Sequence, residues 1–183
     1  MPSQARLITS AALFVAAFFL HAHSLDAQQS TQSEQQHVPP SIQPPINEKL
    51  SLRLHATGNQ IYTCTSEAGQ FAWALKAPEA QLLDEKEQPF GKHFAGPSWQ
   101  ANDGSRVAGK VLTKVDSEDA ESIPWLLIKV VSHEGNGILS RITTIQRLNT
   151  KGGKEPGSGC DADHVKQDVR VPYTADYLFY SPK

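Results

Sequence analysis

The sequence predicts an all-β domain, a single antiparallel β-sandwich or barrel-like fold of about eight strands. Two observations carry this prediction. From Leu50 onward, apolar and polar residues alternate over short stretches, and Gly-containing turn sequences separate those stretches. In addition, no segment after the first 27 residues shows the longer period of an amphipathic helix. Strands without helical crossovers favour an antiparallel sheet.

Composition sets limits on the class of protein. The chain has 183 residues, of which 39% are hydrophobic and 20% charged, as in soluble globular proteins. The formal net charge is -2, so no basic surface for nucleic acid is expected.

The first residues resemble a secretory signal peptide. Arg6 precedes an uncharged apolar run over residues 7–20. At ~1.5 Å per residue this run spans roughly 21 Å, short of the ~30 Å hydrocarbon core, so no permanent membrane anchor is expected. We predict a signal peptide over residues 1–27, cleaved near Ser24 or Ala27, and a secreted or periplasmic location. The alternative is that the run is a buried helix of the fold.

A Gln-, Ser- and Pro-rich stretch follows at residues 28–45 and predicts a flexible tether. The all-β domain is then expected to occupy residues 46–183. Its first strands are predicted at 50–56 and 60–65, joined by a turn at Gly58-Asn59, and a second turn at 67–69 leads into a strand containing Phe71.

Later strands are predicted from β-branched and aromatic residues, at 106–115, 124–131, 139–148 and 173–180. Residues 125–128 are apolar on both faces, which indicates a strand buried on both sides. A β-bulge near Thr143-Thr144 accounts for the broken alternation around it.

The only two cysteines are Cys64 and Cys160. Neither lies in a CxxC motif or in a cluster with zinc-ligand spacing. In an oxidising compartment they are expected to form a disulfide, worth on the order of 4 kcal/mol for so long a loop. The alternative is a pair of buried free thiols.

A series of stretches along the chain resembles one known family. These stretches are GNQIYTC at 58–64, GKHFAGPSW at 91–99, NDGSRVAGK at 102–110, IPWLLIK at 123–129, IQRLNTKGG at 145–153, GCDA at 159–162 and VPYTADYLFY at 171–180. The ordered set resembles the uncharacterised secreted family catalogued as domain of unknown function 3455. The resemblance implies export and an all-β domain, and it brings no established activity and no catalytic residue.

Some relatives in that family carry a malate dehydrogenase label. A nicotinamide enzyme needs a strand–GxGxxG–helix unit to hold the pyrophosphate. The sequence contains no such motif, so this activity is not supported and no cofactor is expected.

Residues 93–105 hold the densest mixture of functional side chains, on a segment predicted to be a loop. An indole flanked by an amide and a carboxylate suits sugar recognition. With one residue from the last strand, the predicted ligand-binding set is His93, Trp99, Asn102, Asp103, Ser105 and Asp176. The alternative is structural: Trp99 packs in the core and Asp103-Gly104 makes a tight turn.

Asp176 has a second interpretation, as the partner of Arg141 or Arg147 in a salt bridge. No metal site is predicted, because Asp161, Asp163 and His164 lack the spacing of a calcium loop.

The sequence thus favours an exported, non-catalytic binding or surface module for carbohydrate or envelope polymer. The first alternative is a small secreted hydrolase that uses Asp103, His93 or Asp176. The second is a structural envelope protein without a ligand.

Overall fold

The computed structural model describes residues 38–183. The predicted signal peptide and its cleavage sites lie outside the described residues, as does the tether up to residue 37. Among residues 38–183, no helix has the length and apolar character needed to span a membrane.

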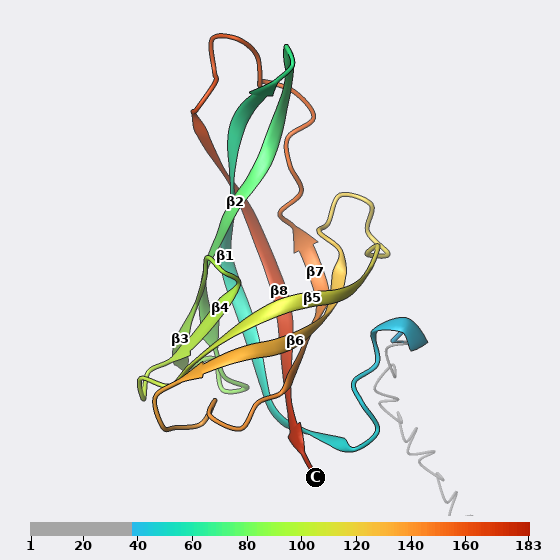
Figure 1. Cartoon of the computed structure of the whole chain (residues 1–183), viewed down its shortest axis with the longest axis vertical. Coiled ribbons are helices and arrows are strands. Elements are labelled where there is room, and N and C mark those ends of the chain that lie inside the picture. The colour runs from blue at the N-terminus through green and yellow to red at the C-terminus, as the bar shows by residue number, and fades with distance from the viewer. Residues whose placement is uncertain (1–37) are drawn as a thin grey trace, which may run out of the picture. The chain divides into compact units, whose positions relative to one another are not determined.

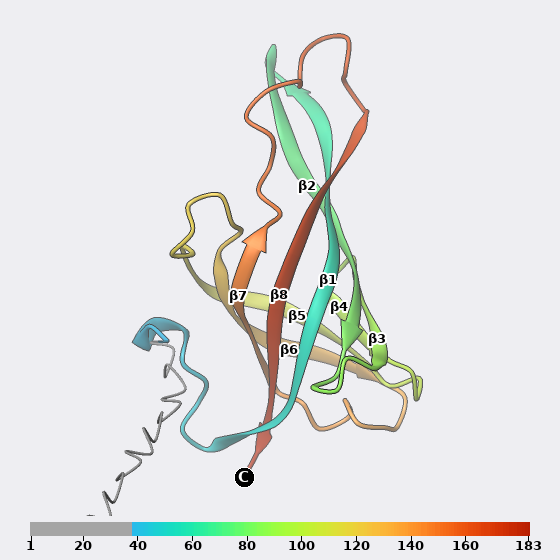
Figure 2. The same cartoon turned by 180° about the vertical axis from the view of Figure 1, so that it is seen from behind.

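Eight strands make up a single antiparallel sheet (Figures 1 and 2). They are β1 (Glu48–Glu67), β2 (Gln70–Leu83), β3 (Pro89–Phe94), β4 (Ser98–Ala101), β5 (Arg106–Val115), β6 (Trp125–Glu134), β7 (Thr144–Gly152) and β8 (Asp168–Pro182). Each strand pairs with the next, and β8 pairs with β1, so the sheet closes on itself. A single 3-10 turn, η1 (Pro40–Ile42), precedes β1. The prediction of an all-β antiparallel domain of about eight strands is confirmed.

Because neighbouring strands alternate in direction, their connections alternate between the two ends of the sheet. We call the end with the turns after β1, β3, β5 and β7 the open end, and the end with the turns after β2, β4 and β6 the closed end. The β6–β7 connection fills the closed end, since its Leu139 and Ile142 are buried in the interior cluster. Of the four connections at the open end, the two longest are residues 116–124, between β5 and β6, and residues 153–167, between β7 and β8.

The β1–β2 hairpin extends beyond the rest of the sheet at the open end (Figure 1). The predicted turn at Gly58-Asn59 is wrong, because β1 continues through both residues. Gly58 is required there for a different reason: a Cβ on it would lie 2.2 Å from the Glu79 carbonyl oxygen of β2. The hairpin turns instead at Ala68 and Gly69, both with positive φ, where the second turn was predicted.

Part of the predicted loop at 93–105 is sheet. His93 belongs to β3 and residues 98–101 form β4. Each of these strands has one large inward side chain, His93 in β3 and Trp99 in β4, and burying them in the interior favours strand pairing over a surface loop. The predicted bulge at Thr143-Thr144 is also wrong. The register shifts between Leu148 and Lys151, where Asn149 has a φ of 53°.

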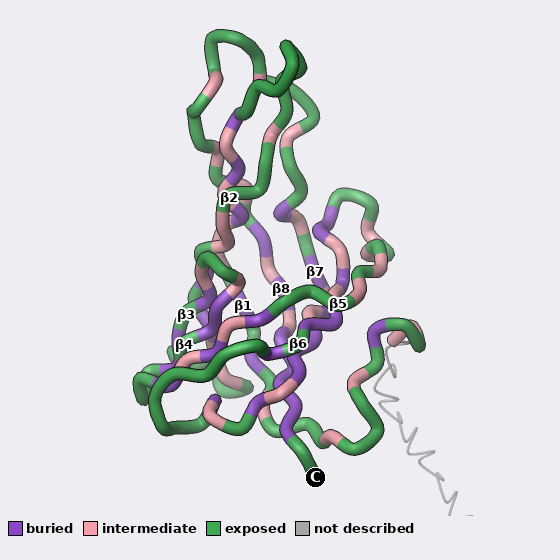
Figure 3. Tube along the Cα trace, viewed as in Figure 1, coloured by how far each residue is buried: buried purple, intermediate pink, exposed green. Residues whose placement is uncertain are grey.

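The interior of the closed sheet is packed around Trp99 and Phe179, both fully buried. Buried segments lie along the strands of the sheet, whereas the tip of the β1–β2 hairpin is exposed (Figure 3). Trp99 meets Phe179 edge to face at 6.3 Å between ring centroids. Gly109 leaves space for the indole, because a Cβ there would approach Trp99 to 3.2 Å. Aromatic packing of this kind contributes beyond the area that it buries.

A second apolar cluster lies on the outer face of the sheet. It consists of Ile42, Trp125, Leu127, Leu148, Leu178 and Tyr180. Trp125 and Leu127 alternate along β6 with the inward Ile128, so this strand is buried on both faces as its sequence predicted. Residues 38–45, assigned by the sequence to the tether, cover this outer face. Ile42 is fully buried and its carbonyl oxygen accepts a hydrogen bond from Gln146 Nε2.

Candidate functional site

His93 and Trp99, two of the predicted binding residues, lie in the core. Their rings stack at 4.5 Å with an interplanar angle of 11°. Both are almost completely buried, so the indole offers no face to a sugar. Burial lowers the pKa of His93 to about 3, although its hydrogen bond with the Ser98 carbonyl favours protonation. His93 is therefore a neutral core residue.

Asp103, Asn102 and Ser105 hold the closed end together. Asp103 Oδ1 accepts hydrogen bonds from the Ser105 backbone N–H and hydroxyl, at 2.9 and 2.6 Å. Its Oδ2 accepts the N–H of Ile138, at 2.8 Å. These bonds lower the pKa of Asp103. Asn102 donates to the carbonyl of Pro89, so this group braces three connections.

Asp176 lies on the outer face of β8. His55 Nδ1 lies 3.0 Å from its Oδ1, and Asn149 Nδ2 donates to its Oδ2 at 2.8 Å. The expected pairing with Arg141 or Arg147 is not formed.

The residues proposed for a hydrolase thus lie in three separate parts of the domain. His93 lies in the interior, Asp103 at the closed end and Asp176 on the outer face of the sheet. None of the three is hydrogen-bonded to another. Asp161 and His164 form an exposed pair at 2.6 Å. Over residues 38–183, no group of three or more His, Cys, Asp or Glu side chains is arranged to hold a metal ion.

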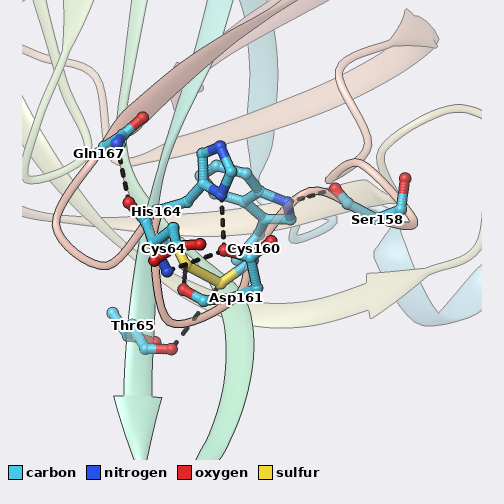
Figure 4. Close-up of polar contacts among 9 residues, drawn as sticks. Cys64, Thr65, Ser158, Cys160, Asp161, His164 and Gln167 are labelled. Carbon is cyan, nitrogen blue, oxygen red and sulfur yellow. Dashed lines mark hydrogen bonds and ion pairs between the residues drawn. A yellow bond between two sulfur atoms is a disulfide. The ribbon is translucent and has the colours of Figure 1, made fainter.

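The Cys64–Cys160 disulfide is confirmed (Figure 4). It ties β1 to the β7–β8 connection, across 96 residues of sequence. Near it, the indole N–H of Trp73 donates to the Ser158 carbonyl at 2.9 Å. The disulfide and this hydrogen bond together hold residues 158–160 against the hairpin.

A pocket of about 600 Å³ lies at the open end of the sheet. One wall is the β1–β2 hairpin, with Tyr62, Trp73 and Leu75. The second is the β5–β6 connection, and the third is β7 with the start of the loop after it.

Hydrogen bonds fix the second wall to the third. The Ser122 hydroxyl accepts the Gly152 N–H at 2.8 Å, and the Ile123 N–H donates to the Gly152 carbonyl at 3.0 Å. Thr150 donates its hydroxyl proton to the Ile123 carbonyl, and Lys154 Nζ donates to the Ala120 carbonyl. The β5–β6 connection is therefore a rigid wall of the pocket.

Arg147 lines the pocket from β7, partly buried. Its Nε and Nη2 both donate to the Pro124 carbonyl, at 3.1 and 2.8 Å. Within residues 38–183 it forms no salt bridge, whereas Arg106 and Arg170 pair with Glu134 and Glu79. The guanidinium is thus a partly buried cation held by a neutral oxygen.

Three buried donors near Arg147 have no hydrogen-bond partner among the described residues. They are Gln60 Nε2, Tyr173 Oη and Tyr177 Oη. Gln60 lines the pocket, and Tyr173 lies behind it, since both approach Gly153. The two hydroxyls lie beside each other without reaching hydrogen-bond geometry.

The phenols around Arg147 remain protonated at neutral pH. Burial raises the pKa of Tyr62 to about 12, and it also raises the pKa of Tyr173 and of Tyr177. The positive charge of Arg147 acts on all three in the opposite direction and is outweighed. Tyr62 uses its proton in a 2.7 Å bond to the Gly153 carbonyl.

The sequence-based prediction missed this pocket. One signal was available, because Gln60 and Arg147 are polar residues at positions whose neighbours two residues away point inward. That pattern marks polar groups inside a closed sheet, but it requires knowing which face is interior.

Fold and pocket together define an all-β domain with a pocket at one end, lined by polar and apolar side chains. Comparison with protein families matches residues 44–181 to the family described as "Protein of unknown function (DUF3455)". The chain belongs to this family. No curated protein and no solved structure matches the chain.

Proposed function

We propose that the chain is an exported, non-catalytic binding protein that takes part of an envelope saccharide into the open-end pocket. One observation carries the proposal: a pocket of about 600 Å³ has the unpartnered amide of Gln60 in its wall. Buried polar groups in proteins are nearly always hydrogen-bonded, so such a donor at a pocket wall indicates a ligand acceptor.

The size and the rim of the pocket both support a saccharide as the ligand. The volume of the pocket lies within the range of roughly 300–1,000 Å³ that is usual for small-molecule sites. Trp73 offers an indole whose N–H is already bonded to Ser158, so the ring is fixed in position. Planar and hydroxyl groups next to an aromatic ring match the alternating C–H faces and hydroxyls of a pyranose.

Binding without catalysis is supported by the state of one carboxylate on the rim of the pocket. Asp119, on the rim, already accepts the Ser122 hydroxyl and the Glu121 N–H, and these bonds lower its pKa. A general acid for glycosidic cleavage needs a raised pKa. Asp103 and Asp176 lie outside the pocket lining.

Export is supported by the charged and apolar pattern of residues 1–20 and by the disulfide. Disulfides persist in oxidising compartments and are rare in the cytosol.

The proposed function is tested by a substitution that fills the pocket with a larger side chain. Ala120 is exposed and lines the pocket from the β5–β6 connection, so Ala120→Trp is expected to fill the space without disturbing the core. The purified full chain is applied to an array of neutral and acidic oligosaccharides, and retention is measured. Wild type is expected to retain at least one saccharide, and Ala120→Trp to lose at least tenfold in affinity for it.

Ala74→Trp is the matched control, because Ala74 is also exposed and is not part of the pocket lining. Its retention is expected to equal that of wild type. If no saccharide is retained, or if Ala120→Trp retains it equally well, the proposed function is wrong.

A further inference from the structure

We infer that the group entering the pocket is a carboxylate on an acidic saccharide unit, bound by Arg147 and Gln60 of the pocket wall. This inference rests on the proposed function and adds the charge and chemistry of the ligand.

The positive charge of Arg147 requires a compensating negative charge. A guanidinium stays protonated in proteins, and taking it partly out of water is unfavourable unless an anion compensates. The Pro124 carbonyl satisfies two donors of Arg147 but carries no charge. Since no carboxylate of residues 38–183 pairs with Arg147, the compensating anion is expected from the ligand.

The buried polar groups near Arg147 lack hydrogen-bond acceptors, not donors. An amide Nε2 can only donate, and a protonated phenol can donate. Gln60 Nε2, in the pocket wall, therefore needs an acceptor, and its side chain is more than nine-tenths buried. The hydroxyls of Tyr173 and Tyr177 lie deeper, in the interior cluster, and add further donors behind the wall. A ligand group with several lone pairs and a negative charge meets both requirements, the charge and the acceptors.

The charges of the pocket lining favour a carboxylate over a more highly charged anion. The charged residues around the rim are Lys114, Lys154, Asp116, Asp119 and Glu155. With Arg147 the lining carries three cations and three carboxylates, so it has no excess positive charge to balance a doubly charged group such as a phosphate monoester. A carboxylate carries one charge, and its two oxygens match the fork of an arginine.

The experiment measures affinity by isothermal titration calorimetry on the full chain. The probes are trigalacturonic acid, its methyl ester and a sulfated trisaccharide of the same length. Wild type is expected to bind the acid at least tenfold more tightly than the ester. Arg147→Gln is expected to remove that preference, while the exposed Arg141→Gln, outside the pocket lining, keeps it.

A second variant guards against misfolding of Arg147→Gln. Gln60→Glu places a carboxylate of the protein in the wall of the pocket that Arg147 also lines, where the carboxylate of the ligand is expected. We expect this variant to lose binding of the acid while its melting temperature stays equal to or above that of wild type. Retained binding of the acid by folded Gln60→Glu contradicts the inference.

The remaining outcomes separate the two claims. If wild type binds the acid and the ester equally well, and Arg147→Gln does not change this, the inference that the pocket binds a carboxylate is wrong. The proposed saccharide function is then unaffected. Binding of the sulfated probe as tight as that of the acid also overturns it. If the array of saccharides gives no retention, the proposed function fails and the inference fails with it.

Discussion

His93 illustrates how burial decides the role of a single residue. In the sequence it stood beside other functional side chains, and in the structure it stacks on Trp99 and lies edge-on to Tyr177 at 5.0 Å. The same side chain on an exposed loop would titrate near neutrality and could act as a base. Inside the sheet, desolvation holds its pKa near 3 and removes that chemistry.

This burial predicts a pH dependence of stability. The pKa of His93 in the folded state, about 3, lies below its ordinary 6.5, so the unfolded chain binds the proton first as pH falls. Between pH 6.5 and 3, His93 is therefore expected to reduce the free energy of unfolding by up to about 1.4 kcal/mol per pH unit. Urea unfolding of wild type and His93→Gln across this range measures the contribution.

The glutamine keeps a side-chain donor for the Ser98 carbonyl and does not titrate. We expect the slope against pH to be shallower in His93→Gln, since the carboxylates that contribute at the lower end are common to both proteins. Equal slopes would show that His93 is not a buried neutral group.

At the level of elements, the disulfide supports one wall of the pocket. It anchors the β7–β8 connection near the point where Ser158 orients the Trp73 indole. Replacing both cysteines (Cys64→Ala with Cys160→Ser) is expected to lower the free energy of unfolding by about 2–4 kcal/mol, because the unfolded chain gains freedom.

The same double variant is also expected to bind the saccharide more weakly, because residues 158–160 lose their anchor. Urea unfolding and calorimetry measure the two effects. An unchanged unfolding midpoint would contradict the structural role of the bridge, and unchanged affinity would remove this loop from the binding site.

The strands also show which elements the sequence could predict. Local composition placed β5 at its observed bounds, and the continuous apolar run at residues 125–128 indicated that β6 is buried on both faces. Gly58 was misread as a turn because its requirement comes from β2, 21 residues away, through the close approach of Glu79. Turn residues and close-contact glycines look alike until the pairing is known.

At the level of the whole molecule, closure of the sheet creates the pocket. Gln60 comes from β1, Asp119 from the β5–β6 connection and Arg147 from β7, and only the pairing of β8 with β1 brings these parts of the chain together. The sequence predicted the fold class, the disulfide and the family. It directed attention to residues 93–105, which brace the core and the closed end, because clustering in sequence is not clustering in space.

The place where the ligand binds is the most direct test of the open-end pocket as a saccharide site. Nuclear magnetic resonance spectra of the ¹⁵N-labelled full chain, recorded during titration with trigalacturonic acid, report which N–H groups sense the ligand. Binding in the open-end pocket predicts shifts for the Gln60 side-chain amide, the Arg147 Nε–H and the Trp73 indole N–H, with the Asn102 and Ser105 amides unchanged. Shifts confined to residues 93–105, with the three pocket groups unaffected, would contradict it.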